Sequence, residues 1–370
     1  MTWTLVGQEQ AVAALAGAAG SGRAAHAYLF AGPAHVGKTL AAIQFAQTLN
    51  CTGAEPPCGR CRQCERIAAG AHPDVDLVGI GGMCDESEHR HSADDSRSIR
   101  VCQVRRVQHL ITRAPFEGRC RVVIFEPADA LEPIAANALL KTLEEPPDNV
   151  VLILVTDREE MLLPTIRSRA RRVAFGGLTQ MAIERALRTR WDAEPSLAAR
   201  LARLAGGRLG WALLALRDER MVDLREEALD RAQALASAPM AERFAFAAEL
   251  GGRYTKDRAG VQAALETWQA FWRDILLIAA GREQQAAHRE RLDRLRALAA
   301  QCDVAGAARA LRAIADARQQ LVENGSPILV LQVMMLAVPE LRANAVSERL
   351  TRTGGAAMTN EQGRGPGDNS

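Results

Sequence analysis

The sequence has few aromatic residues, no marked excess of either charge and no long apolar run. Phe, Trp and Tyr make up 4% of the 370 residues. Together with a second half rich in Ala, Leu and Arg, this favours helices over a β-sandwich. Lys and Arg number 46 against 44 Asp and Glu, a formal net charge of +2, so any contact with nucleic acid must be local. No apolar stretch is long enough to cross a bilayer and the start lacks a secretory signal pattern, so we expect a cytoplasmic protein.

The chain is too long for one compact core, and its first half alternates between two patterns. Short apolar runs separated by helical periodicity predict a doubly wound parallel sheet up to about residue 176. The polar stretch 81–98 predicts a loop. The apolar runs are 27–31, 75–80, 121–125 and 150–156, and the helical patterns reach residue 16 and cover 40–49 and 134–145.

The second half predicts helices only. An Ala, Leu and Arg pattern over 179–216, broken at Gly206-Gly207, indicates a small helical domain, and longer helices follow to about 341. The tail from about Val346 has little to bury and predicts disorder. The expected division is a nucleotide-binding domain at 1–176, a small helical domain at 177–218, an all-α domain at 219–342 and a tail at 343–370.

A phosphate-binding motif follows the first apolar run. The segment GPAHVGKT matches G-x-x-x-x-G-K-[ST] between a predicted strand and a predicted helix, the context that the motif requires. The glycines let backbone N–H groups close around phosphate, while the lysine reaches the terminal phosphates and the threonine supplies a hydroxyl to Mg²⁺. The motif predicts binding of ATP or ADP with Mg²⁺, against the alternative of a Gly-rich turn without a nucleotide. Its residues are Gly32, Pro33, Ala34, His35, Val36, Gly37, Lys38 and Thr39.

Hydrolysis needs further groups than the phosphate motif. An acidic residue at a strand end must hold Mg²⁺, and a carboxylate must activate water. The run 121–125 leads into Glu126, which can serve the metal, and Pro127, which cannot act as a base. Asp129 lies further along, where we expect it to cap the following helix rather than to act as the base. The sequence therefore supports nucleotide binding better than hydrolysis.

Four of the eight cysteines form a compact cluster. Cys51, Cys58, Cys61 and Cys64 have the spacing C-x6-C-x2-C-x2-C, with Gly and Pro between them to supply turns. Four thiolates at such spacings can close a tetrahedral Zn²⁺ site, and they indicate a reducing compartment rather than disulfides. No polar catalytic residue stands among them, so we expect a closed structural zinc module at about 51–64. The alternative is four unrelated thiols.

The other four cysteines predict no site. Cys84, Cys102 and Cys120 are isolated in the sequence, and Cys302 lies in a helical stretch where a small buried residue is expected. His89 and His91, near Cys84, raise the hypothesis of a second metal site, which the polar character of the surrounding loop argues against.

These motifs together resemble one known family. A phosphate loop with an inserted four-Cys module, followed by NALLKTLEEPP at 137–147, closely resembles the clamp-loader branch of AAA+ proteins, which serves bacterial DNA polymerase III. Further matches are VGQ at 6–8, HAYLF at 26–30 and TIRSR at 165–169, while Thr156 resembles the family's polar sensor. Covering roughly residues 5–340, the resemblance implies an α/β AAA+ P-loop domain with an inserted zinc module, a small helical lid domain and an all-α collar domain.

The sequence departs from the family's motor subunits at three places. The family's Ser-Arg-Cys motif supplies an arginine finger to the ATP of a neighbouring subunit, and here 168–170 reads Ser-Arg-Ala, which keeps Arg169. The family's strand-end Asp-Glu pair is here Glu126 and Pro127. A sensor arginine is replaced by Gly210, unless Arg208 substitutes through a shift in register. The resemblance thus implies a stator subunit that completes the loader ring and lends Arg169 to an adjacent ATP, with an ATP-hydrolysing motor subunit as the alternative.

The implied partners are other clamp-loader subunits in a hetero-oligomeric ring, the sliding clamp, and primed DNA through the assembled complex, with no membrane. The arginine-rich run 167–172 has two other interpretations, a solvated charged face or a contact with DNA phosphates. Lys141 is expected on the surface. A free-standing zinc module that binds nucleic acid is a third function, which the near-neutral composition does not favour.

Overall fold

The computed structural model describes residues 3–84, 90–91, 96–323 and 325–341, and it divides the chain after Arg217 into two compact units. The first unit contains a parallel sheet with helices, and the described part of the second is helical. The expected α/β domain with a mostly helical remainder is therefore confirmed. None of the helices in the described ranges has the length and apolar character that a bilayer crossing requires.

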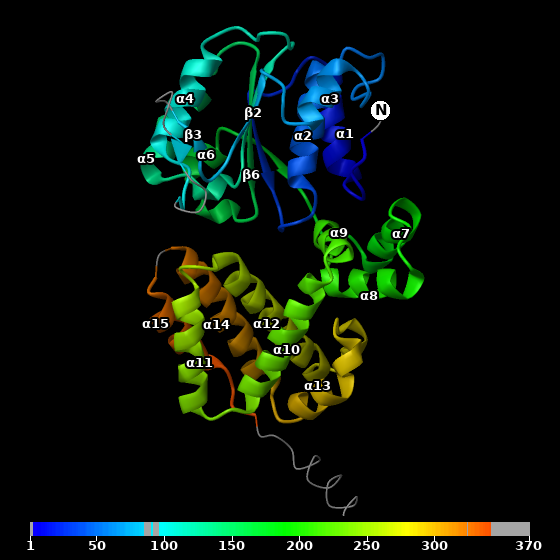
Figure 1. Ribbon diagram of the computed structural model, residues 1–370, viewed down its shortest axis with the longest axis vertical. Helices are drawn as coiled ribbons and strands as arrows, with labels where there is room; N and C mark the ends of the chain where they lie inside the picture. Colours follow the sequence, from blue (N-terminus) through cyan, green and yellow to red (C-terminus); the bar gives the residue numbers. More distant parts are fainter. Residues whose placement is uncertain (1–2, 85–89, 92–95, 324, 342–370) are drawn as a thin grey trace, which may run out of the picture. The chain divides into compact units, whose positions relative to one another are not determined.

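The first unit is built on a five-stranded sheet in the order β2-β5-β6-β1-β7, and every neighbouring pair is parallel (Figure 1). Three of the predicted strands have the bounds that the sequence indicated, while β2 ends two residues earlier than expected. The strands are β1 (Ala27–Ala31), β2 (Val75–Val78), β5 (Arg121–Phe125), β6 (Val150–Thr156) and β7 (Arg171–Ala174).

The inner strands are buried on both faces because helices cover the sheet on each side. Successive side chains point to opposite faces, so neighbouring residues of β1 enter different cores. Tyr28 and Phe30 face the helix that carries Phe45, whose ring lies 5.0 Å from that of Tyr28. Leu29 joins the other core with Leu139. A continuous apolar run in the sequence is the consequence of this two-sided burial.

The helices of the first unit follow the predicted alternation, with three that the sequence did not predict: α3 (Arg62–Ala68), α4 (Val101–Ile111) and α6 (Pro164–Arg167). Helix α4 was not predicted, although its buried residues Val104, Val107 and Ile111 recur at helical spacing on a polar background. Helix α8 ends at Gly206, which adopts the left-handed conformation (φ 57°) that favours glycine. The helices are α1 (Glu9–Gly20), α2 (Lys38–Asn50), α3 (Arg62–Ala68), α4 (Val101–Ile111), α5 (Pro133–Glu144), α6 (Pro164–Arg167), α7 (Gln180–Arg190), α8 (Pro195–Ala205) and α9 (Leu209–Arg217), with short 3₁₀ turns η1 (Ala128–Ala130) and η2 (Glu159–Met161).

Two elements correct the sequence prediction. Edge strand β7 begins in the arginine-rich run, and of its four residues only Val173 is buried while the two arginines before it are exposed, as suits the edge of a sheet. The stretch 81–98 is not all loop, because β3 (Gly82–Met83) pairs antiparallel with β4 (Arg90–His91). Strands of two residues are too short to show an alternating pattern.

The second unit contains only helices in its described part, 218–323 and 325–341. They enclose a core in which the side chain of Arg243 is fully buried and donates hydrogen bonds to four backbone carbonyls, those of Ala236, Ala238, Val338 and Pro339. The elements are α10 (Arg220–Ser237), α11 (Met240–Arg253), α12 (Arg258–Ala279), η3 (Glu283–Gln285), η4 (Arg289–Arg291), α13 (Leu292–Ala299), α14 (Val304–Val322) and α15 (Pro327–Ala337). The domain bounds given above stay predictions, and the tail 343–370 lies outside the described residues.

A buried carboxylate fixes the loop that leads into β5. Asp74, fully buried, accepts hydrogen bonds from the backbone N–H groups of Phe116, Glu117 and Gly118 at 2.7 to 2.9 Å and from Arg121 at 3.0 Å. Burial alone would raise the pKa of Asp74, but these donors outweigh it and hold the pKa below its ordinary value. The charged form is therefore the one that the fold stabilises.

We predict that Asp74→Ala lowers the free energy of unfolding of the first unit by about 3–5 kcal/mol, because it leaves buried donors without an acceptor. The control Asp76→Ala removes a half-exposed carboxylate paired with Arg106 and should change the free energy of unfolding by at most about 1 kcal/mol. Since the folded pKa of Asp74 is depressed, its contribution is complete above the ordinary aspartate pKa of about 4 and is lost as the pH falls below it. Urea unfolding at several pH values checks this. An equal decrease in the free energy of unfolding of the two variants at neutral pH would contradict this prediction.

Candidate functional site

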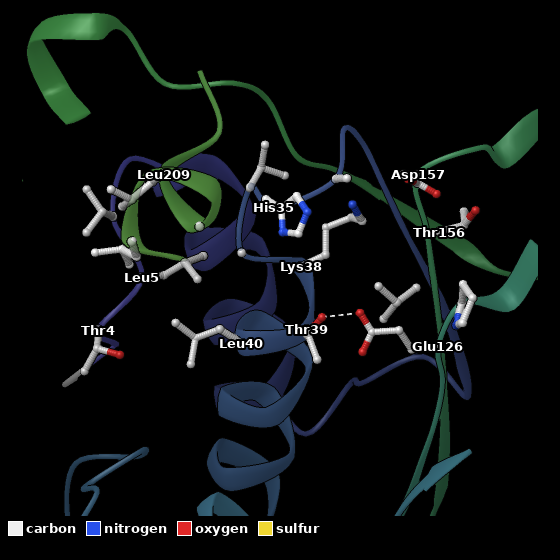
Figure 2. A pocket seen from close by; sticks show the side chains of 18 of the residues that line it. Thr4, Leu5, His35, Lys38, Thr39, Leu40, Glu126, Thr156, Asp157 and Leu209 are labelled. Carbon is white, nitrogen blue, oxygen red and sulfur yellow. Dashed lines mark hydrogen bonds between the residues drawn. The ribbon is translucent and has the colours of Figure 1, made fainter. Parts of the chain in front are cut away.

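The phosphate loop joins the end of β1 to the start of α2. Gly37, at the N-cap of α2, has φ 98°, and His35 has φ 60°, so the loop curls back before the helix begins. A cavity of about 780 Å³ opens over this loop and over the carboxyl ends of β5 and β6 (Figure 2). Predicted residues from Ala34 to Thr39 line it, together with Glu126 and Thr156. The structure thus brings these candidates to one cavity.

Lys38, the first residue of α2, is almost entirely buried. Its Nζ donates to the carbonyl oxygens of Gly32 at 2.8 Å and Pro33 at 2.6 Å. Burial lowers the pKa of Lys38, while the carboxylates of Asp157, Glu126 and Asp129 act in the opposite direction. The ammonium group is therefore held at the centre of the loop, where an anionic ligand would meet it.

Thr39 and Glu126 lie together on one side of the cavity. The hydroxyl of Thr39 donates to Oε1 of Glu126, the bond drawn in Figure 2. A hydroxyl and a carboxylate side by side are the two protein oxygens that a Mg²⁺ ion beside a bound phosphate would need. Pro127 follows at the cavity wall and has no side-chain group that accepts a proton.

Asp129 does not cap the following helix, which corrects the sequence interpretation. The N-cap of α5 is Glu132, whose side chain makes no capping bond. The buried carboxylate of Asp129 instead accepts from the hydroxyl of Thr156 at 2.6 Å and from Arg158. Because these residues lie on two different strand ends, only the parallel pairing of β5 with β6 brings them together. Asp129 thereby fixes the orientation of the candidate sensor Thr156.

Several residues of the cavity were missed by the sequence interpretation. Asp157, next to Thr156, belongs to its lining and acts electrostatically on Lys38. Gln8, from the VGQ match and outside the lining, donates to the carbonyl of Gly176 at 2.7 Å and to that of Val36 at 3.4 Å, which ties the start of the chain to the phosphate loop. The rest of the lining comes from segments remote in sequence: Thr4, Leu5, Val6, Arg190, Trp191, Leu209, Gly210 and Leu213. Arg208 is not in this lining, and its Nε donates to the carbonyl of Ala205.

Arg169 is absent from the lining of this cavity. It follows α6, where its Nη1 donates to the carbonyl of Thr165 at 3.0 Å and its Nη2 lies 2.7 Å from Oε1 of Glu144. The side chain of Arg169 is 36% exposed. Its guanidinium is therefore oriented by α5 and α6 and remains accessible from outside the chain.

The four predicted zinc ligands converge. Cys51 follows α2, Cys64 lies in α3, and the thiol sulfurs of these two and of Cys58 and Cys61 all lie within 4.8 Å of one another. A tetrahedral Zn²⁺ with bonds of about 2.3 Å requires sulfurs about 3.8 Å apart, and the Cys51 and Cys61 sulfurs are 4.0 Å apart. A Cβ added to Gly53 would lie 2.9 Å from Cβ of Cys58, so glycine is required at that position. The cluster could hold a metal ion.

The surroundings of the sulfurs favour a thiolate at Cys61 and a neutral thiol at Cys64. Backbone N–H groups of Gly53, Cys58, Cys61 and Cys64 donate to sulfur atoms within the cluster. Burial raises the pKa of Cys61, but hydrogen bonds from the backbone of Cys64 and Thr52 outweigh it and lower that pKa to about 5. Burial raises the pKa of Cys64 to about 12. Four thiolates this close together need a cation to balance their charge, and four sulfur ligands are a donor set that suits Zn²⁺.

One further interpretation of the cysteines needs correction. Cys102 is isolated in the sequence but lies near Cys84 in the fold: burial, and then this neighbouring thiol, raise the pKa of Cys102. His89 and the side chain of His91, on which the hypothesis of a second metal site depends, lie outside the described residues.

Fold and site together define an α/β protein with a P-loop sequence motif, a four-thiol cluster and a mostly helical remainder. A family model described as "DNA polymerase III, delta subunit" matches residues 7–179. The chain is 27% identical to the DNA polymerase III subunit delta' of Bacillus subtilis over 86% of its own length and 92% of that protein. It is 41% identical to the delta' subunit of Pseudomonas aeruginosa over 40% of its length and 43% of that protein.

The gamma/tau subunits give shorter matches. The Mycobacterium tuberculosis protein is 38% identical over 46% of this chain, but the match covers 28% of that relative. The family model and the delta' relatives support a clamp-loader subunit of the delta-prime type, the family that the motifs indicated.

We predict about one Zn²⁺ per chain in protein purified without added zinc, because the cluster offers four converging thiolates and needs no other ligand. The double variant Cys61→Ser/Cys64→Ser should lose the metal, measured by elemental analysis. In the control Cys302→Ser, a buried thiol of the second unit is replaced and the metal should be retained. Metal near zero in the unmodified chain, or full retention in the double variant, would refute the assignment.

Proposed function

We propose that this chain is the delta-prime-like stator of a DNA polymerase III clamp loader, which completes the loader ring and supplies Arg169 to the ATP of a neighbouring subunit. The observation that carries the proposal is the similarity to the Bacillus subtilis delta' subunit over 92% of that protein. The position of Arg169 supports it, since this side chain is accessible and lies outside the lining of its own cavity. A finger that acts on another subunit needs both properties.

The proposed domain roles follow the same resemblance. Helices α7 to α9 are the lid domain, and the second unit is the collar through which subunits join. The partners are gamma/tau-like and delta-like subunits of the loader, the sliding clamp, and primed DNA reached through the assembled complex. A protein with this role works in the cytoplasm, where the chromosome is copied.

The P-loop cavity is proposed to bind ATP or ADP with Mg²⁺ without efficient hydrolysis. Lys38 supports phosphate binding, and the Thr39 and Glu126 pair supports a metal beside it. Water activation is the missing step, because Pro127 occupies the position after Glu126 and Asp129 is engaged with Thr156 and Arg158. Bound nucleotide then acts as a structural ligand that joins the phosphate loop to the lid helices.

The zinc module is proposed to be structural. Gln47 of α2 donates to the carbonyl of Cys64 at 2.8 Å, and Arg66 of α3 pairs with Glu117 in the loop that Asp74 fixes. A Zn²⁺ ion on the four thiolates joins the end of α2 to α3. Through these contacts the metal stabilises one face of the nucleotide-binding domain.

A motor subunit of the same loader is the second candidate function. The complete P-loop and the 38% identity to a gamma/tau subunit favour it. The short coverage of that relative, together with Pro127 and Gly210, argues for the stator instead. ATP turnover by the isolated chain separates the two functions.

We predict that the isolated chain binds ATP or ADP but hydrolyses ATP at a rate close to the uncatalysed background. Lys38→Ala should abolish binding, measured by fluorescence of a labelled nucleotide, because the ammonium group at the centre of the loop is lost. The control Lys141→Ala removes an exposed lysine and should bind normally. Steady-state ATP turnover that disappears in Lys38→Ala would favour the motor subunit.

We predict that Arg169→Ala leaves folding, zinc content and ring assembly intact but lowers the DNA- and clamp-stimulated ATPase of the reconstituted loader. Arginine fingers contribute roughly 10³ to 10⁵ in rate, but the loss is confined to the site that this chain serves. Arg169→Lys should rescue poorly, because lysine keeps the charge without the planar fork of donors.

The matched control is Arg171→Ala, which removes an exposed charge from the same run. The finger requires that Arg169→Ala reduces loading and Arg171→Ala does not. If both variants reduce loading equally, the run acts as a basic DNA contact. If neither does, it is a solvated face.

A further inference from the structure

The start of helix α9 is bonded directly to the phosphate loop. The backbone N–H of Gly210, the second residue of α9, donates to the carbonyl of His35 at 2.8 Å. N–H groups in the first turn of a helix have no partner within the helix, so they bind water, a ligand or another part of the chain. Here that partner is the loop expected to cradle phosphate. We call this bond the Gly210 latch.

Only glycine permits so close an approach. A Cβ built on Gly210 would lie 2.8 Å from the carbonyl oxygen of His35 and 3.3 Å from its carbonyl carbon and Cα. These are backbone atoms of a tight loop, so no side-chain rotation could relieve the overlap. Any other residue at 210 must move α9 away from the loop, and the hydrogen bond lengthens or breaks.

The turn between α8 and α9, which contains Gly207, also makes a backbone hydrogen bond to another segment. The N–H of Leu178 donates to the carbonyl of Gly207 at 2.9 Å, and a Cβ on Gly207 would lie 3.1 Å from Cα of Gly177. Gln8 bonds Gly176 just before this contact. Helix α9 therefore meets the phosphate loop directly, while the turn that precedes it is bonded to the segment leading into α7, and both contacts are made by backbone groups.

The latch closes one side of the cavity. Leu209 and Leu213 of α9 line it, and Arg190 and Trp191, at the end of α7, lie in the same lining. Figure 2 shows Leu209 near Leu5, while Lys38, Thr39 and Glu126 occupy the region toward the strand ends. A nucleotide whose phosphates meet Lys38 would therefore have the lid helices beside its other end.

We propose that Gly210 is a positioning residue of the nucleotide site, which holds the lid helices closed with or without nucleotide and makes nucleotide exchange slow. This inference rests on the proposed nucleotide binding. Because the latch is formed by two backbone groups, it is equally available to the empty and the occupied site. Breaking it destabilises both closed states by the same amount, so the rates of exchange change while the equilibrium affinity does not.

The test compares Gly210→Ala with Gly17→Ala, a helical glycine of the same unit where an added Cβ meets no atom within 4 Å. Stopped-flow fluorescence with a labelled ADP gives association and dissociation rates. We expect both rates to rise about 2- to 10-fold in Gly210→Ala, the equivalent of one net hydrogen bond, with a nearly unchanged dissociation constant. Gly17→Ala should match the unmodified chain. Unchanged rates in Gly210→Ala, or a slower association with weaker binding, would overturn the latch.

A measurement on the unmodified chain guards against misfolding of the variant. Amide hydrogen exchange followed by NMR should show that the Gly210 N–H is protected in the nucleotide-free protein, since its acceptor is His35 and not a ligand. Exchange of Gly210 as fast as that of an exposed amide would overturn the latch. Failure of unmodified protein and Lys38→Ala alike to bind nucleotide would refute the proposed nucleotide site. The exchange of Gly210 would then still decide whether the latch exists.

Discussion

The parallel pairing of β5, β6 and β1 is the constraint on which the cavity depends. Its register sets Phe125 beside Leu154 and Ala31 beside Thr156, so the three strands end together at one edge of the sheet. The phosphate loop follows the end of β1, Glu126 follows the end of β5, and Asp157 follows the end of β6. No local sequence feature brings these groups together. A shift of one residue along either pair would turn the following side chains to the other face and separate Thr39 from Glu126.

The sequence predicted those parts of the structure that local chemistry decides. Buried parallel strands must be apolar on both faces, so β1, β5 and β6 could be recognised as continuous runs, and the P-loop and four-cysteine spacings each specify a backbone path. Tertiary contacts decided what was missed. Asp129 was read as a helix cap because its partner Thr156 lies 27 positions away on another strand. Strand β7 resembled a solvated basic run because only one of its four residues is buried. The lining from α7 and α9 required knowledge of where the helices fold back.

The cysteine cluster and the loop that leads into β5, which both lie between β1 and β5 in the sequence, stabilise each other. The cysteine cluster extends from the end of α2, and Arg66 on its short helix pairs with Glu117, whose backbone N–H is held by Asp74. Asn50, the last residue of α2, accepts from the N–H groups of Arg119 and Cys120 in the same loop. The start of β5 is thus held by residues on both sides of the four cysteines, Asn50 before them and Arg66 after them. A metal there would act on the nucleotide cavity only through this scaffold, since none of its ligands lines the cavity.

The proposed stator divides its chemistry between two places. At its own cavity, two functional side chains of the family's motor subunits are missing. Gly210 replaces the sensor arginine and offers only a backbone N–H, and Pro127 replaces an acidic residue and cannot act as a base. Away from that cavity, Arg169 keeps its guanidinium, bonded to Thr165 and paired with Glu144. A guanidinium has five N–H donors, and two of them suffice for these contacts, which leaves the remainder for an anion. Its pairing with Glu144 is half exposed and therefore contributes little to stability, but it restricts the rotamers of a long side chain before a partner arrives. An arginine finger oriented in this way loses less conformational entropy when it binds a phosphate. This property suits a subunit that keeps a fixed position in the ring better than a motor subunit that hydrolyses its own ATP.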